Sequence, residues 1–347
     1  MSSLALSLGF LIFSFITTSL AIIPFINLLY KLKFQRAQQE TTDAFGKLTP
    51  IFDQFHGKKV GTPVGGGLLV IMIVSGLFSL ILPIFSVMGI EVTSVYANYQ
   101  KEVNVLFFTF LSFGVLGLYD DIKKFFGFSK EKFFGLRMHQ KLILQLILAT
   151  VAAAMLYFNL GISIVNVPFV GTFELGWGFI PFAVFVILAF ANAVNITDGL
   201  DGLASGTLMI SLFGLWFLSS TILDVPLSLF LVLWIGSLIS FLYFNVYPAR
   251  LFMGDVGAMA FGATLAVVGL LLGKIVALLI IGFIFVFEIS TSLIQLLSKR
   301  FLHKKIMPAA PFHLTLQKIG WEEPKIVQRV WLMQIMLTLF GVWLAMI

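Results

Sequence analysis

Ten runs of mostly apolar residues dominate the sequence, and each is long enough, or nearly long enough, to cross a lipid bilayer. A spanning helix needs about 20 such residues. Because backbone groups in lipid must be hydrogen-bonded within the segment, the sequence predicts an all-α, polytopic membrane protein with about ten transmembrane helices in a single domain over residues 1–347. The runs cover residues 4–30, 65–90, 104–119, 141–161, 175–195, 202–222, 226–244, 256–273, 275–298 and 327–346.

The positive charges indicate which loops face the cytoplasm. Twenty of the 22 Lys and Arg residues fall in alternate loops, and only Lys101 and Lys274 fall in the others. Lys and Arg concentrate in cytoplasmic loops, so both termini are predicted to lie outside. In so apolar a chain the net charge of +6 indicates topology and anionic lipid, not nucleic acid. The predicted cytoplasmic segments are 31–64, 120–141, 195–202, 245–255 and 299–326.

Asp120 and Asp121 stand where the third apolar run meets a basic loop. Carboxylates at the end of a span are costly unless they are solvated, paired or coordinating. Two adjacent carboxylates raise each other's cost of ionisation, which a divalent cation or an ammonium group relieves. The simpler alternative is an ion pair with Lys124, four residues after Asp120 on the same helix face.

Four polar side chains recur every three residues where the fifth run ends: Asn192, Asn195, Asp198 and Asp201. In helical geometry they would share one side. A polar turn with Asp201 as the N-cap of the next helix would explain one of them but not all four. The pattern therefore favours a binding site at the cytoplasmic end of this run.

The remaining polar motifs are weaker individually. Asp255 opens the eighth run as either a plain N-cap or a Mg²⁺ ligand, since Mg²⁺ usually takes one or two protein carboxylates plus phosphates and waters. Lys59 precedes a glycine-rich helix start whose free N–H groups favour anions. His313, in a basic loop, is by itself more typical of a surface residue. Glu288, inside the ninth run, is predicted to hydrogen-bond a neighbour within the bundle.

Taken together, these pieces resemble the polyprenyl-phosphate N-acetylhexosamine-1-phosphate transferases, which are integral membrane enzymes of ten helices. The resemblance runs from about Lys59 to Trp331. Within the family, the segment from Gly320 to Trp331 resembles the branch that transfers phospho-N-acetylmuramoyl-pentapeptide. The motifs are Lys59-x-Gly-Thr-Pro, Asp120-Asp121-x-x-Lys124, Gly135-Leu136-Arg137-x-x-Gln140-Lys141 with Gln145, Asn192 to Gly202, Asn245 with Phe252-Met253-Gly254-Asp255, and Glu288-x-Ser290 with Gln295.

Two motifs depart from that branch. Val64 stands where it usually has Thr, and His313-Leu314-Thr315 stands where it usually has three histidines. A transferase for UDP-GlcNAc or a related sugar is therefore an alternative. A transporter or lipid flippase is a second one, although the acidic residues cluster at one face.

The resemblance implies a Mg²⁺-dependent enzyme of the bacterial plasma (inner) membrane with its active site on the cytoplasmic face. It implies that undecaprenyl phosphate accepts the phospho-sugar of UDP-N-acetylmuramoyl-pentapeptide, giving lipid I and UMP. Whether the chain forms a homodimer is left open. The implied catalytic residues are Asp120, Asp121, Asp255 and His313. The implied substrate-binding residues are Lys59, Lys124, Lys141, Asn192, Asn195, Asp198, Asn245 and Phe252. The implied metal ligands are Asp255, Asp198 and Asp121.

Overall fold

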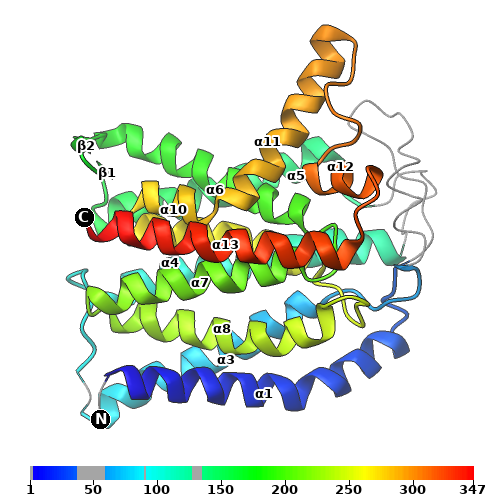
Figure 1. Ribbon diagram of the computed structural model, residues 1–347. Helices are drawn as coiled ribbons and strands as arrows, with labels where there is room; N and C mark the ends of the chain where they lie inside the picture. Colours follow the sequence, from blue (N-terminus) through cyan, green and yellow to red (C-terminus); the bar gives the residue numbers. More distant parts are fainter. Residues whose placement is uncertain (1–2, 37–58, 90, 127–134) are drawn as a thin grey trace.

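The computed structural model describes residues 3–36, 59–89, 91–126 and 135–347, so parts of two predicted cytoplasmic loops, 37–58 and 127–134, lie outside it. The described chain is a bundle of long, roughly parallel helices (Figure 1). Nine of the described helices are long and apolar enough to cross a membrane, and a bent pair makes a tenth. The all-α membrane architecture is therefore confirmed. The nine are α1 (Ser3–Lys31), α3 (Gly66–Val87), α4 (Tyr99–Phe126), α5 (Met138–Ala154, continued by the π-helix η2, Met155–Asn159), α6 (Phe179–Thr197, preceded by the 3₁₀ turn η3, Gly176–Gly178), α7 (Leu203–Thr221), α8 (Val225–Asn245), α9 (Gly254–Leu271) and α13 (Glu323–Met346).

Helix α4 is longer than the 104–119 run predicts, at both ends. It starts at Tyr99 and includes Glu102, which lies before the start of the predicted run. Glu102 is fully buried and accepts a hydrogen bond from Ser94 Oγ at 2.8 Å. At the other end Asp120 and Asp121 lie inside the helix, because local ion pairs and hydrogen bonds offset the loss of hydration. Hydropathy alone ends the predicted run at residue 119, directly before these two charges.

The ninth run is not one straight helix. It is divided into α10 (Ile275–Ile281) and α11 (Phe283–Leu297), which meet at Gly282 with a bend of 75°. The carbonyl of Ile281 accepts hydrogen bonds from Gln334 Nε2 at 2.6 Å and Ser211 Oγ at 3.1 Å, so neighbouring helices satisfy it at the break. Helix α11 then leaves the bundle (Figure 1), followed by the π-helix η4 (Ser298–Leu302) and α12 (Phe312–Lys318).

Helix α9 is the centre of the bundle, and nearly all of its residues are buried. Small residues allow its neighbours to approach closely, as is typical of membrane helix packing. A Cβ atom on Gly67 of α3 would lie 2.2 Å from the Cα of Gly257. One on Gly262 would lie 2.3 Å from the carbonyl oxygen of Phe190 in α6. The position of α9 is therefore fixed by backbone contacts on several sides.

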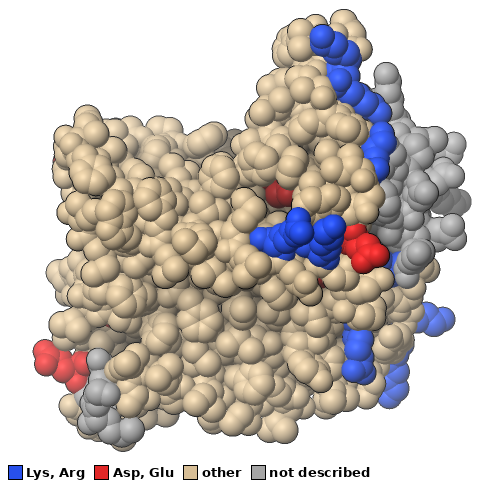
Figure 2. Space-filling view, in the orientation of Figure 1, with Lys and Arg blue, Asp and Glu red and all other residues tan. Residues whose placement is uncertain are grey.

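The two ends of the bundle differ in charge. Both chain termini lie at one end (Figure 1), and on the face in Figure 2 the Lys and Arg side chains gather at the other. That the termini lie outside the cell stays a prediction. The termini end also carries an antiparallel hairpin of β1 (Ile164–Val167) and β2 (Gly171–Glu174), with Val167 opposite Gly171. Neither this hairpin nor α12 was predicted from the sequence.

Candidate active site

Asp255, in the first turn of α9, is the centre of a charged cluster at the basic end of the bundle. Lys124 from α4 donates to its Oδ2 at 2.7 Å, and Lys141 from α5 donates to the same oxygen at 2.6 Å. Asn195 from α6 donates to Oδ1 at 3.1 Å. Four helices far apart in sequence thus converge on one carboxylate, which makes more contacts than the N-cap alternative requires.

Asp120 shares both lysines with Asp255. Its Oδ2 lies 3.2 Å from the Nζ atoms of Lys124 and Lys141, and its Oδ1 accepts the backbone N–H of Leu136 at 2.7 Å. The carboxylate is 2% exposed. A buried carboxylate, the 17% exposed carboxylate of Asp255 and two ammonium groups therefore form one network of ion pairs. Such a group is tolerated in a low-dielectric region because each charge is paired.

Asp121 is bound to the backbone at the start of α9. Its Oδ2 accepts the N–H of Val256 at 3.0 Å, so a side chain from α4 caps α9. Gly254, with φ +79°, makes this turn, and a Cβ there would lie 2.8 Å from the same Oδ2. One oxygen of Asp121, expected to be a metal ligand, is thus occupied by the helix N-terminus.

A cavity of about 280 Å³ opens beside this cluster. Asp198 lies at its wall directly after α6, half-buried. Burial and the nearby charge of Asp255 raise the pKa of Asp198 to about 8, although Lys59 and Arg36 oppose the shift. The lining residues are Arg36, Val64, Asp121, Lys124, Asn195, Asp198, Gly199, Leu200, Asp201, Asn245, Phe252, Gly254 and Asp255.

Lys59 is held at the edge of this cavity by two carboxylates. Its Nζ lies 2.6 Å from Asp201 Oδ1 and 2.6 Å from Glu323 Oε1. Glu323 also accepts the backbone N–H of Asp201 at 2.6 Å. Asp201 is not the N-cap of α7, because Gly202, with φ +78°, occupies that position. Asp201 and Glu323 were not among the predicted site residues, although Asp201 belongs to the three-residue spacing and Glu323 lies in the segment from Gly320 to Trp331.

Of the other predicted binding residues, Phe252 and Asn245 line the cavity and Asn192 does not. Phe252 lines the cavity, and the Arg36 guanidinium and the Lys59 ammonium lie 5.8 and 5.9 Å from its ring centre. Asn245 reaches the wall but is nearly fully buried, with its amide bonded to Ser205 and to the carbonyl of Leu251. Asn192 is not among the lining residues, because its amide donates to Gln145 at 3.0 Å.

His313 is buried, so its interpretation as a surface residue is wrong. The side chain is 2% exposed and its Nδ1 lies 3.0 Å from Oε2 of Glu288. Glu288 thus binds a neighbour, as expected. On the other side of the ring, a Cβ atom on Gly199 would lie 2.5 Å from Nε2. His313 therefore packs against the turn that follows Asp198 and is not part of the cavity lining.

The carboxylate and amide oxygens at the cavity suit a cation that binds together with a substrate. Within the described residues, no three His, Cys, Asp or Glu side chains form a group that could hold a metal ion. Asp198 and Asp255 do face one cavity, with the amide of Asn195 beside them. Two carboxylates plus substrate phosphates and water is the environment that Mg²⁺ prefers.

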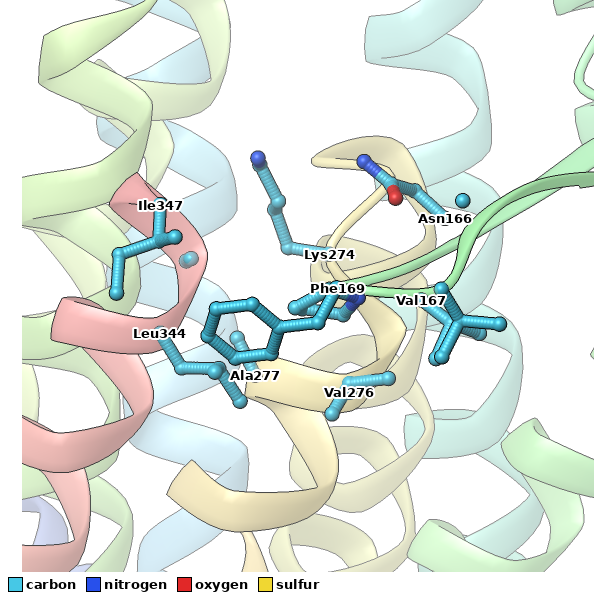
Figure 3. A pocket seen from close by; sticks show the side chains of 12 residues that line it. Asn166, Val167, Phe169, Lys274, Val276, Ala277, Leu344 and Ile347 are labelled. Atoms are coloured by element: carbon cyan, nitrogen blue, oxygen red, sulfur yellow. The ribbon is translucent and has the colours of Figure 1, made fainter.

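A second cavity, of about 390 Å³, lies at the termini end and contains none of the predicted site residues. The hairpin tip at Phe169 covers it, and α10 and α13 form its sides (Figure 3). Lys274 is its one charged side chain. Its lining contains no Asp or Glu side chain, unlike the cavity beside Asp255.

The chain is similar to known membrane enzymes over most of its length. A model of glycosyl transferase family 4 matches residues 103–273, the part that carries the Asp120 and Asp255 cluster. The fold and this match define the class, a multi-pass membrane transferase.

Curated relatives define the branch. The chain is 37% identical over 319 residues to "Phospho-N-acetylmuramoyl-pentapeptide-transferase" of Clostridium perfringens (strain SM101 / Type A), covering 91% of this chain and 90% of that one. It is 32% identical over 340 residues to the Bacillus subtilis (strain 168) protein of that name, covering 97% and 95%. The chain belongs to the phospho-N-acetylmuramoyl-pentapeptide-transferase family.

Proposed function

We propose that the cavity beside Asp255 is the active site in which the protein transfers phospho-N-acetylmuramoyl-pentapeptide from its UDP derivative to undecaprenyl phosphate. An oxygen of the lipid phosphate would attack the β-phosphorus, the bond from that phosphorus to the bridging oxygen would break, and UMP would leave with the bridging oxygen. The products are lipid I and UMP. The observation that carries the proposal is the convergence of four helices on Asp255, which two lysines contact and which lines one cavity together with Lys124 and Asp198.

Lys124 and Lys141 would reduce the repulsion between the two phosphates that react. The attacking and the departing phosphates are both anionic, and they repel each other unless cations lie between them. Lys124 and Lys141 contact both Asp255 and Asp120. Their side chains are 29% and 18% exposed, so they can exchange a carboxylate oxygen for a phosphate oxygen. Asp120 would orient them and accept a proton from the lipid phosphate.

We propose Mg²⁺ as the cofactor, held by Asp255 and Asp198 with Asn195 beside them. When bound, it would neutralise the pyrophosphate of the donor. Asp121 would act indirectly, by fixing the start of α9. Arg36 and Phe252 line the cavity, and the Lys59 ammonium lies 5.9 Å from the centre of the Phe252 ring; these three residues would hold the nucleotide.

The position of the cavity fits a cytoplasmic donor. It lies at the end of the bundle where Lys and Arg gather (Figure 2), and cytoplasmic loops carry such an excess. We therefore propose an inner-membrane protein, one integral domain, with this end on the cytoplasmic side.

The proposal is tested with purified protein, undecaprenyl phosphate and UDP-N-acetylmuramoyl-pentapeptide, by measuring UMP release with and without Mg²⁺. Asp255→Asn should lower turnover by at least about 100-fold, while size-exclusion behaviour and melting temperature show that the fold is retained. Glu91→Gln, at the other end of the molecule, is the matched control and should keep wild-type turnover. Wild-type UMP release by Asp255→Asn contradicts the proposal.

The same assay tests the alternative donor. His313-Leu314-Thr315 departs at Leu314 and Thr315 from the three histidines that the family resemblance implies. None of these three residues lines the cavity, although His313 packs behind Gly199 of its wall. The departure therefore leaves the lining residues unchanged, and we expect the pentapeptide donor to be used. UMP release from UDP-GlcNAc alone would assign the protein to the sugar-transferring alternative.

A further inference from the structure

Two buried carboxyl groups face each other at the termini end, far from the candidate active site. Glu102, in the first turn of α4, is 0% exposed, and Asp224, directly before α8, is 2% exposed. Asp224 lies within hydrogen-bonding reach of Glu102. Among the described residues, no ion pair reaches either carboxyl. Two buried negative charges without a cation would be strongly destabilising.

The hydrogen bonds divide unequally between the two groups. Asp224 Oδ1 accepts the N–H of Leu227 at 3.1 Å as the N-cap of α8, and its Oδ2 accepts the N–H of Val95 at 3.4 Å. Glu102 Oε2 accepts from Ser94 Oγ, but its Oε1 is buried without any hydrogen-bond partner. A buried carboxyl group that lies against another acceptor, and whose second oxygen has no donor, can satisfy both groups by holding a proton between them.

The pair lies under a segment that ties several helices together. Residues 91–98, here called the outer strap, connect the end of α3 to α4. Thr93 Oγ1 donates to the carbonyl of Leu223 at 2.7 Å, and its own carbonyl accepts the N–H of Val225 at 2.9 Å. Tyr96 Oη donates to the carbonyl of Leu271, at the end of α9, at 2.6 Å. The strap therefore holds α4, α8 and α9 at this end.

We propose that Glu102 and Asp224 form a proton-binding site in which Glu102 donates the shared proton through Oε1 to Asp224, and that this proton keeps the outer strap closed. Loss of the proton leaves two adjacent buried carboxylates, and their repulsion detaches the strap. A cavity of about 350 Å³ adjoins Asp224 and is lined also by Glu91, Thr93 and Ser228. It gives water a path to the pair when the strap opens.

The surrounding groups are consistent with this assignment. Burial is the main cause that raises the pKa of Asp224 above its ordinary value. Burial, followed by the charges of Glu102 and Asp224, raises the pKa of Tyr96, so this phenol stays neutral across the useful pH range. Glu91 and Lys101 are exposed neighbours on the strap and on α4. The folded pair holds a proton that the unfolded chain releases, so stability should fall as pH rises.

The experiment compares wild-type protein with Glu102→Gln and Asp224→Asn between pH 5.5 and 8.5. Each amide supplies the missing donor permanently, and Asn still caps α8 through Oδ1, although it loses the 3.4 Å bond that Oδ2 of Asp224 accepts from the N–H of Val95. Wild-type amide exchange in residues 91–98, corrected for its intrinsic pH dependence, should speed up by up to about tenfold per pH unit over the range in which the closed pair keeps a proton that the open strap releases, and should level off once the closed pair has lost that proton. Both variants should lack this acceleration and the matching fall in apparent melting temperature.

Glu91→Gln is the control, because this exposed acid lines the same cavity and should leave the wild-type response intact. If Glu102→Gln shows the same pH response as the wild type, the proposal is overturned. It is also overturned if chelation at pH 8.5 destabilises the wild type but not Glu102→Gln, since the pair then binds a divalent cation instead of a proton.

Discussion

The glycine at position 117 offers the sharpest test of how the fold positions Asp255. Gly117 lies on α4 where this helix meets the start of α9. A Cβ atom there would lie 2.2 Å from the carbonyl oxygen of Asp255 and 2.6 Å from the Cα of Val256. Both neighbours are backbone atoms and cannot rotate away. Ordinary contact begins at 3.4 Å, so Gly117→Ala must push the two helices apart by about 1 Å.

A displacement of about 1 Å at a reacting centre costs about 100-fold in rate. We therefore expect Gly117→Ala to lower kcat/KM for UMP release by about 100-fold, because Asp255 moves relative to Lys124 and Lys141. The overpacking itself should cost about 1–3 kcal/mol of stability. Both quantities are measured on purified protein, with melting temperature beside initial rates.

Two other glycines provide matched controls. A Cβ on Gly114, one turn earlier on α4, would lie 2.9 Å from Cδ1 at the end of the Ile71 side chain, which can rotate away, and in ordinary contact with Ala260 Cβ at 3.8 Å. One on Gly76 would meet nothing within 4 Å. Gly114→Ala and Gly76→Ala should keep activity within about threefold of the wild type. A Gly117→Ala protein with wild-type kcat/KM would refute the view that backbone contact between α4 and α9 sets the position of Asp255.

Two further predictions concern the cavity wall. Glu323→Gln removes one of the two carboxylates on Lys59, so it should lower stability by about 1–3 kcal/mol and raise KM for the nucleotide sugar more than it lowers kcat; an unchanged KM would argue against a role for Lys59 in binding. The pKa of Asp198 is raised to about 8. In the folded protein this carboxyl therefore keeps a proton that it loses in the unfolded chain once the pH exceeds the ordinary pKa of an aspartate. Without metal, stability should therefore fall as pH rises toward 8, and Asp198→Asn should flatten that fall in melting curves; equal slopes would exclude the shift.

Hydropathy and charge predicted most of the fold because lipid leaves few choices to the backbone. They misplaced the features that depend on tertiary partners. The bend at Gly282 is invisible in an uninterrupted apolar run, because Gln334 and Ser211, which satisfy the carbonyl of Ile281, come from other helices. The early start of α4 depends on the burial of Glu102 beside Asp224, which no local pattern reveals.

The sequence predicted which residues of the candidate site come together but not how their charges pair. The sequence indicated that separate carboxylates meet at one end, and the structure brings Asp120, Asp198 and Asp255 together there. It did not reveal which charges pair. Glu323 lies 264 residues after Lys59, so their ion pair could not be anticipated from spacing. The burial of His313 depends on Glu288, a partner from a helix that the bend carries out of the bundle.

The enclosure of α9 has a consequence for how such a protein can move. Backbone-to-backbone contacts with α3, α4 and α6 leave this helix no room to rotate or slide. We therefore expect Asp255 to keep its position, and any opening that admits a long lipid to involve helices outside these contacts, such as α11. Spectroscopic labels on α9 and its three neighbours should keep constant separations through a catalytic cycle, while a label on α11 changes its distance to all of them.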